Sequence, residues 1–496
     1  MLMRDRLTMP QMLLILAEVI AFALLAGIAT SHFGIGGGAR ITVGYMVAYF
    51  VPRLLLMRAR GSSMASQVIL FVLAVGLCYI EYTRLLNWTF FDEFSLQYPN
   101  LKGDARVFYR WALNVYQGVE PHDSVVFPGF PLLMVGLWKV FGLSAIWPQS
   151  MNLMFTLTSV VLTGMITRRV LSHRVSVSSQ ALLTGGMLLV CLLLFYMFIC
   201  TAMLKEASIA FSVALSGFAL SSMVASDEKR HHPWRDILLF VLACALLGLV
   251  RTTYLYFILI GVIVLSLPHL RRDWKMALLM CGILVVSLVV GNYFSSYSFD
   301  RHAEIAGGGW NMQRFYVISE SQRFYHELLN YYFLYPVWHK LLMLPLTVSV
   351  QFVIPFPWTY NENATFLNQL SRMTYGWYLL GGTSVFYYIY ASWRRVGNMG
   401  VWAWWPALCY LAIAYVMAGS VARYVLPIQP LFVPVAMYVL CRLYEGRWRK
   451  PYIIWMVIFI ILLIVALLLC LEIQQGAISK MLHTQSLVNY WHGLDY

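Results

Sequence analysis

Charged residues are scarce in this sequence. Asp, Glu, Lys and Arg together make up 11% of the 496 residues, whereas soluble domains contain roughly a quarter. Hydrophobic residues make up 60%, so too few polar side chains remain to cover an apolar core in water. The scarcity of charge therefore excludes the soluble-domain classes and predicts an integral membrane protein.

The sequence also lacks the usual signatures of disulfide frameworks, metal centres and nucleotide sites. Its eight cysteines lie in apolar runs and form no Cys-x-x-Cys pair, and its eleven histidines are dispersed. Such cysteines are typical of small buried hydrophobes. The glycine run at 307–309 has no strand-to-helix context for a phosphate loop. We therefore predict no cofactor, with a divalent metal left open, and no nucleotide-sugar site.

Positive charge exceeds negative charge, with 35 Lys and Arg against 21 Asp and Glu and a formal net charge of +14. A nucleic-acid-binding protein would gather this charge on one face or tail. Here the basic residues occur as scattered pairs between apolar runs, which is typical of the ends of membrane spans. The distribution argues against nucleic acid as a partner.

Apolar runs of membrane-spanning length dominate the chain. A helix needs about 20 apolar residues to cross the hydrocarbon core. Segment 341–357 is apolar too, but Pro345, Pro355 and Pro357 predict a break, so we expect a re-entrant or interfacial piece there. The sequence thus predicts one all-α polytopic membrane domain over residues 1–496. Its spans number about thirteen: 11–29, 41–57, 66–86, 147–166, 180–203, 207–225, 237–250, 254–268, 276–292, 373–392, 401–419, 425–442 and 452–471.

Basic pairs in the short loops indicate the orientation of these spans. The first apolar run follows two arginines and lacks a convincing cleavage site, so we expect a retained span with the N-terminus in the cytoplasm. The opposite, extracytoplasmic side then holds two long segments, 87–146 and 293–372. The residues that fall on the cytoplasmic side are Arg4, Arg6, Arg58, Arg60, Arg168, Arg169, Lys229, Arg230, Arg271, Arg272, Arg394, Arg395 and those of 447–450.

The first long segment carries a polar motif. Residues 104–117 have apolar side chains at helical spacing, which predicts an amphipathic helix lying in the membrane interface. Asp104 opens this helix and Gly118 closes it. Two interpretations of Asp104 stand side by side: a simple N-cap, or a carboxylate that faces a lipid-lined cavity and orients a hydroxyl.

The motif resembles a known family. Gly-Asp-Ala at 103–105, Pro-Gly-Phe-Pro at 128–131 and Phe-Gly at 141–142 are similar to the first outer loop of GT-C-fold glycosyltransferases. These enzymes use polyprenyl-phosphate-linked sugars and include the protein O-mannosyltransferases and the lipid A aminoarabinose transferases. The likeness spans roughly residues 66–445, because three later segments also resemble the family: 203–206, 249–252 and 422–427.

The resemblance implies a GT-C-like bundle and roles for particular residues. The family's first-loop Asp is its catalytic carboxylate, and Asp104 occupies the matching position; Asp92 and Glu93 form a rival acidic pair that the pattern also allows. Phe108 stands where a Tyr is commoner in the family, and more than one span precedes the loop. Neither departure touches the expected chemistry, but span numbers cannot be carried over.

Cations stand near the predicted ends of three spans, at Lys205, Arg251 and Arg423. Each one alone is explained by snorkelling to headgroups or by pairing, such as Lys205 with Glu206. Three cations on the face of the Asp104 loop would instead form an anion site for a phosphate leaving group. The residues expected to bind substrate are Lys205, Glu206, Arg251, Arg314, Arg423 and Tyr424.

For two sets of charged residues, a purely structural role is the alternative to a role in the site. Arg314 lies in the second long segment, which is also typical of an ordinary solvated loop resting on the membrane. Glu18, Glu81 and Arg84 lie in or near spans that precede the first loop, and interhelical pairing is favoured over catalysis for each.

These observations predict a membrane glycosyltransferase of the cell envelope, integral to the inner or plasma membrane. It would move a sugar from a polyprenyl-phosphate-linked donor to a hydroxyl of a lipid, glycan or protein acceptor, by inverting displacement on the extracytoplasmic face. Two rivals remain. One is a polytopic transporter or lipid flippase, although no paired halves with broken helices are visible. The other is an O-antigen-type polymerase or ligase, whose chemistry would rest on arginines of 293–372.

Overall fold

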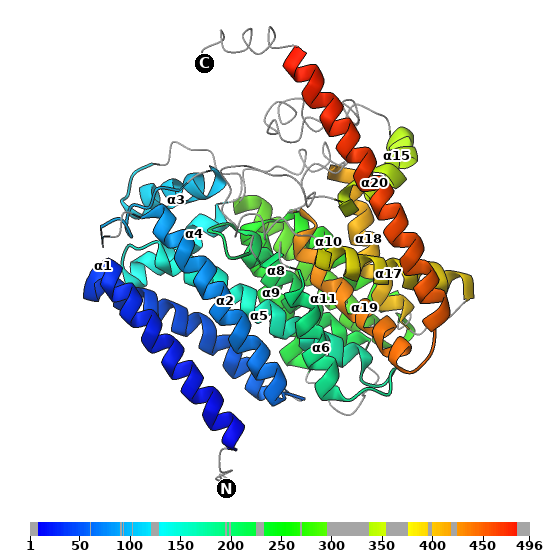
Figure 1. Cartoon of the computed structure of the whole chain (residues 1–496), viewed down its shortest axis with the longest axis horizontal. Coiled ribbons are helices and arrows are strands. Elements are labelled where there is room, and N and C mark those ends of the chain that lie inside the picture. The colour runs from blue at the N-terminus through cyan, green and yellow to red at the C-terminus, as the bar shows by residue number, and fades with distance from the viewer. Residues whose placement is uncertain are drawn as a thin grey trace.

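The protein is built from helices (Figure 1). Within the described ranges every regular element is an α-helix or a short 3₁₀ turn, which confirms the predicted all-α class. The computed structural model describes residues 8–59, 61–89, 92, 94–101, 103–120, 128–193, 196–197, 200–224, 233–267, 270–294, 337–353, 375–394, 399–417 and 424–483.

Six helical stretches in the described part of the chain are long and apolar enough to cross a membrane, by length and composition. They are Met9–Arg58 (α1), Met64–Trp88 (α2), Ile146–Leu171 (α5), Glu206–Met223 (α8 and η1), Leu426–Tyr444 (η7 and α19) and Arg449–Ala466 within α20 (Arg449–His483). They identify a helical membrane protein. The other helices are α3 (Gly103–Tyr116), α4 (Gly129–Phe141), α6 (Ser179–Cys191), α9 (Pro233–Val250), α10 (Thr253–Ser266), α11 (Leu270–Phe294), α15 (Val337–Val353), α17 (Tyr375–Arg394) and α18 (Gly400–Met417).

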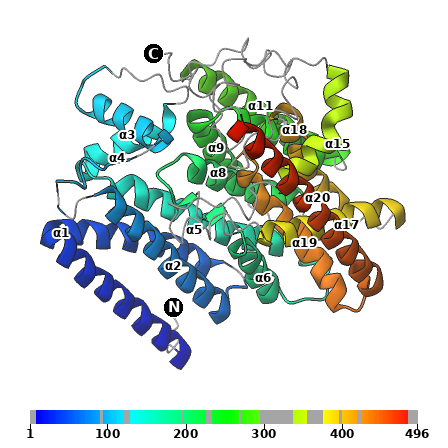
Figure 2. The same ribbon diagram turned by 45° about the horizontal axis from the view of Figure 1, so that its top comes forward.

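Helix α1 consists of two arms, as the separate runs 11–29 and 41–57 predict. The backbone leaves helical geometry at Gly34, whose φ of 70° is a conformation that glycine adopts readily. Figures 1 and 2 show the two blue arms meeting at this corner. A buried ion pair joins the arms, because Arg53 Nε lies 2.9 Å from Glu18 Oε1 and the Tyr49 hydroxyl donates to the same oxygen. The interhelical pairing predicted for Glu18 is confirmed.

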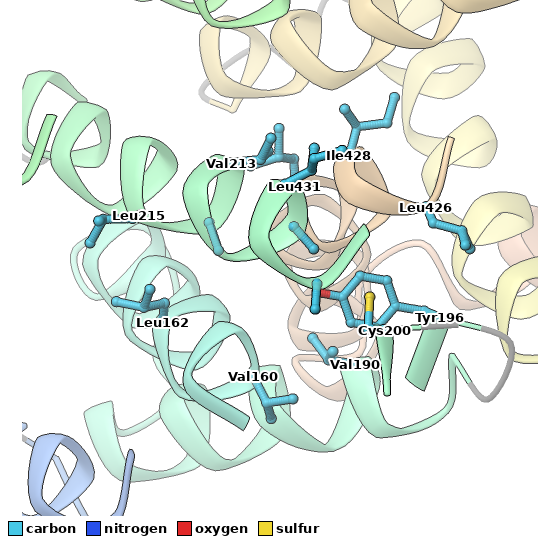
Figure 3. Packing of buried hydrophobic residues seen from close by; sticks show 14 of the residues in the cluster. Val160, Leu162, Val190, Tyr196, Cys200, Val213, Leu215, Leu426, Ile428 and Leu431 are labelled. Atoms are coloured by element: carbon cyan, nitrogen blue, oxygen red, sulfur yellow. The ribbon is translucent and has the colours of Figure 1, made fainter. Parts of the chain in front are cut away.

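Helix α5 is the centre of the bundle. It packs against α1, α2, α6, α8 and α19, and most of its side chains are buried. Figure 3 shows Val160 and Leu162 of α5 among side chains of α6, α8 and the η7–α19 segment. Because α5 touches both the early and the late helices, its polar side chains reach segments that are far apart in the sequence.

The turns with predicted cytoplasmic arginines meet at one end of the bundle, which we call the basic end. A Cβ on Gly61 would lie 3.4 Å from the Arg168 side chain, and the amide of Ser176 donates to Glu445. Arg174 donates to the carbonyl of Val224. The opposite end, which we call the site end, carries α3 and α4 at the start of α5. These contacts bring the turns at 61–63, 168–178, 221–224 and 442–449 together, while the membrane side on which they lie stays a prediction.

Two predictions about single segments are wrong. The run 180–203 is not one span, because α6 ends at Cys191 and residues 201–205 are non-helical ahead of α8. No proline or glycine marks this interruption, and side chains from other helices hold it instead. Pro345 does not break the run at 341–357, because α15 continues through it. Pro355 and Pro357 lie outside the described residues.

Candidate functional site

The predicted interfacial helix is present as α3. Its buried side chains are Phe108, Tyr109 and Ala112, while Arg106 and Arg110 are exposed, as the amphipathic pattern predicts. Helix α3 begins at Gly103, so Asp104 lies within the first turn, next to the cap position that the simpler interpretation assigns to it. Asp104 is exposed. An exposed carboxylate in this position can accept a hydrogen bond from a hydroxyl group.

Aromatic contacts fix α3 on α4. The Phe108 and Phe130 rings lie 5.8 Å apart edge to face, and the Tyr109 and Trp138 rings 4.9 Å apart. Helix α4 in turn starts directly against the end of α9, because a Cβ on Gly129 would lie 2.0 Å from the Leu249 carbonyl oxygen. Only glycine permits this approach. The Pro-Gly-Phe-Pro segment thereby brings the first loop beside the α9–α10 junction.

Lys205 and Glu206 form the start of α8 and lie beside α3. The Lys205 ammonium is 5.3 Å from the centroid of the Phe108 ring, within cation–π range. Asp104 and Phe108 are four residues apart on α3 and therefore share one face of that helix. Glu206 is buried, at 3% exposure. The contact places the first turn of α8 against the helix face that carries Asp104.

Arg251 occupies the junction between α9 and α10 and is 7% exposed. Its guanidinium lies 4.4 Å from the Tyr424 ring centroid and 5.9 Å from that of Tyr254. The Tyr254 hydroxyl donates to the Tyr424 carbonyl oxygen at 2.8 Å, which holds both rings in place. Glu206 attracts the Arg251 charge from the start of α8. Among the described residues, Arg251 Nε is a buried donor without a hydrogen-bond acceptor, so one donor at this junction is unsatisfied.

Lys205, Glu206, Arg251 and Tyr424 are therefore brought together from three segments, with Phe108 linking them to α3. We call these five residues the cation cluster. It pairs a buried carboxylate with two cations whose contacts include aromatic rings, an arrangement able to hold a phosphate.

The remaining predicted site residues fall elsewhere. Asp92 is exposed in the loop after α2, where its carboxylate accepts from the Ser95 amide at 2.5 Å. This bond closes a local turn, and the catalytic role of Asp92 stays a prediction. Glu93, Arg314 and Arg423 lie outside the described residues.

The prediction of interhelical pairing covers Arg84 but misses the polar side chains of α5 that support the cluster. Asn152 and Thr156 of α5 and Arg84 of α2 all bond to the stretch 200–204, which leads into Lys205. A signal was available in the sequence. Gln149, Asn152 and Thr156 recur at helical spacing inside an apolar run, and polar groups inside a membrane span usually have partners.

Within the described residues, no group of three or more His, Cys, Asp or Glu side chains is arranged to hold a metal ion. Comparisons with protein-family models, with curated proteins and with solved structures give no match.

Proposed function

We propose that this protein transfers a sugar from a polyprenyl-phosphate-linked donor to a hydroxyl acceptor on the extracytoplasmic face of the cell membrane. In this proposal the helices form a GT-C-like bundle of about thirteen spans, with the site end facing outward. The observation that supports it most is the meeting of the Asp104 helix with the cation cluster through the Phe108–Lys205 contact.

The proposed reaction is a direct displacement at the anomeric carbon. The acceptor oxygen forms a bond to that carbon while the bond from the carbon to the phosphate oxygen breaks and its electron pair leaves with the phosphate. Asp104 orients the acceptor hydroxyl and receives its proton. Lys205 and Arg251 stabilise the charge that develops on the departing phosphate.

Glu206 and Tyr424 have supporting roles in this scheme. The carboxylate of Glu206 offsets part of the buried positive charge of Arg251, and the Tyr424 ring orients the guanidinium plane. An arginine held in this way keeps a fixed set of donors aimed at a phosphate, which gives the transition state preorganised partners.

The experiment compares Asp104→Asn with Arg314→Gln in one transfer assay. The purified protein in nanodiscs receives polyprenyl-phosphate sugars and candidate acceptors, and product is followed by mass spectrometry. The proposal expects Asp104→Asn to lose most activity and Arg314→Gln to retain it in large part. An inactive Arg314→Gln variant together with an active Asp104→Asn variant would favour the alternative of an O-antigen-type polymerase or ligase. Passage of labelled lipid across the bilayer without any transfer would favour the flippase reading.

A further inference from the structure

The start of α8 is preceded by an irregular stretch at 201–205. These residues lack helical structure, although they lie deep in the bundle, where Thr201 and Met203 are buried. Non-helical backbone at such depth persists only where protein or water satisfies its polar groups. The conformation of this stretch sets the position of Lys205 and Glu206, because they follow it directly.

Asn152 of α5 supplies two hydrogen bonds to this stretch. Its Nδ2 donates to the carbonyl oxygen of Ala202 at 2.6 Å and to that of Leu204 at 2.8 Å. The side chain is fully buried. Both amide hydrogens are therefore used, and they bind the backbone on either side of Met203, two residues before Lys205.

Two further side chains hold the same stretch. The Thr156 hydroxyl, one turn further along α5, lies 3.2 Å from the carbonyl oxygen of Cys200 as well as 2.8 Å from that of Asn152. Arg84 of α2 donates to the Thr201 hydroxyl at 3.1 Å. Helix α2 is itself tied to α5, since Gln149 Nε2 donates to the Glu81 carbonyl oxygen at 2.9 Å. The irregular stretch thus rests on two packed helices.

We infer that Asn152 is a positioning residue that fixes Lys205 and Glu206 against Phe108 and Arg251. The inference rests on the proposed function for its purpose, because it supposes that the cluster binds a lipid phosphate. The two hydrogen bonds that Asn152 donates go to Ala202 and Leu204, outside the cluster. It acts through the backbone of residues 202–204. Thr156 has the same role, but through a single, longer hydrogen bond to the carbonyl oxygen of Cys200.

The test uses Asn152→Asp, which keeps the shape of the side chain but removes both N–H donors. Two readouts are combined: hydrogen–deuterium exchange of the amides in 200–208, and the affinity for undecaprenyl phosphate in nanodiscs, with the uncharged polyprenol as reference. Asn152→Asp is expected to speed exchange in 200–208 and to weaken binding on the order of 100-fold, the scale of a misplaced binding group. Asn152→Gln, which retains both donors on a longer stem, should recover part of the affinity.

A matched pair of milder variants guards against simple misfolding. Thr156→Val removes the bond to Cys200 and should weaken binding about fivefold, as loss of one hydrogen bond does. Thr163 lies on the same buried helix, but its hydroxyl donates to the carbonyl oxygen of Ser159 within α5. Thr163→Val should therefore leave exchange in 200–208 and affinity at the wild-type values. Equal losses in the two valine variants would overturn the inference in favour of general damage to α5.

The outcomes separate the positioning role from the proposed function. Unchanged exchange and unchanged affinity in folded Asn152→Asp would overturn the positioning role. If wild type binds undecaprenyl phosphate no better than the polyprenol, the proposed function fails, and exchange alone then decides the role of Asn152. Faster exchange in 200–208 supports the role in that case, and unchanged exchange overturns it.

Discussion

The two ends of the bundle differ in what their charged side chains contact. At the basic end, Arg442 donates to Glu445 at 2.8 Å, and Arg169 lies 3.5 Å from Asp236. At the site end, Lys205 and Arg251 lie over aromatic rings, and Arg251 Nε has no acceptor in the described structure. Arg442 and Arg169 also lie over rings, those of Tyr438 and Phe218, but each has a carboxylate partner as well. Arg251 instead keeps one guanidinium nitrogen without an acceptor among the described residues. Under the proposed function, the basic end serves stability and the site end serves binding.

The largest effect is expected for Asp104→Asn, which sharpens this contrast by removing one charge from the site end. The variant keeps the volume of the side chain and loses the negative charge, so transfer should fall roughly 100- to 10,000-fold. Its melting temperature should match that of wild type, because α3 keeps its aromatic contacts. Sugar transfer and thermal melting of the same purified sample measure both.

Asp92→Asn is the control, since Asp92 is also exposed and its carboxylate accepts from the Ser95 amide in a local turn. Its transfer rate should change little. A dead Asp92→Asn beside an active Asp104→Asn would move the catalytic carboxylate to the upstream acidic pair.

A comparable effect, on stability instead of activity, is expected for Glu18→Ala. It leaves Arg53 buried without its carboxylate near the basic end, and breaking a buried pair costs about 3–5 kcal/mol. The melting temperature should drop strongly. The double variant Glu18→Leu/Arg53→Met should recover much of it, because no unpaired charge remains. A double variant as unstable as Glu18→Ala would show that the pair matters through something other than its charges.

Arg251→Gln and Arg442→Gln form a matched pair across the two ends. Both arginines lie over a tyrosine ring, at 4.4 Å from that of Tyr424 and 5.0 Å from that of Tyr438. Arg251→Gln should lower transfer roughly 100- to 1,000-fold, the scale of one lost transition-state donor. Arg442→Gln should leave the transfer rate intact and lower the melting temperature slightly. Equal effects on transfer would remove the distinction between the ends.

The sequence predicts the helices at both ends of the bundle better than the contacts between their side chains. Long apolar runs predict helices reliably, because lipid demands internally bonded backbone, and the two arms of α1 follow from that rule alone. The amphipathic spacing of 104–117 likewise predicts α3 within a residue. These features depend on local composition, which a sequence displays directly.

The interruption at 201–205 could not be predicted in the same way. Its stretch contains no glycine or proline, and the groups that hold it come from Asn152 and Arg84, about 50 and 117 positions away. The partner of Glu18, at Arg53, is also set by how two helices cross. Tertiary contacts decide these features, so single-sequence patterns predict the residues that can pair but not which pairs form.

The smallest effect is expected at Glu445, in the turn between α19 and α20, and it tests the basic end by pH. The carboxylate accepts from the Ser176 amide at 3.0 Å, from the Ser176 hydroxyl at 2.9 Å and from Arg442 at 2.8 Å. These bonds, that of the backbone amide first, lower the pKa of Glu445 from 4.5 to about 2. A carboxylate with a lowered pKa in the folded state contributes stability that is fully present above pH 4.5. That stability is lost as the pH falls from 4.5 towards 2.

Glu445→Gln should therefore lower stability by about 1 kcal/mol at neutral pH, the scale of a solvent-accessible ion pair. The difference in melting temperature between wild type and Glu445→Gln should shrink through the same acidic range, while transfer at neutral pH stays unchanged. A difference that is constant from pH 7 to pH 2 would mean that the charge of Glu445 does not hold the α5–α6 turn to the α19–α20 turn.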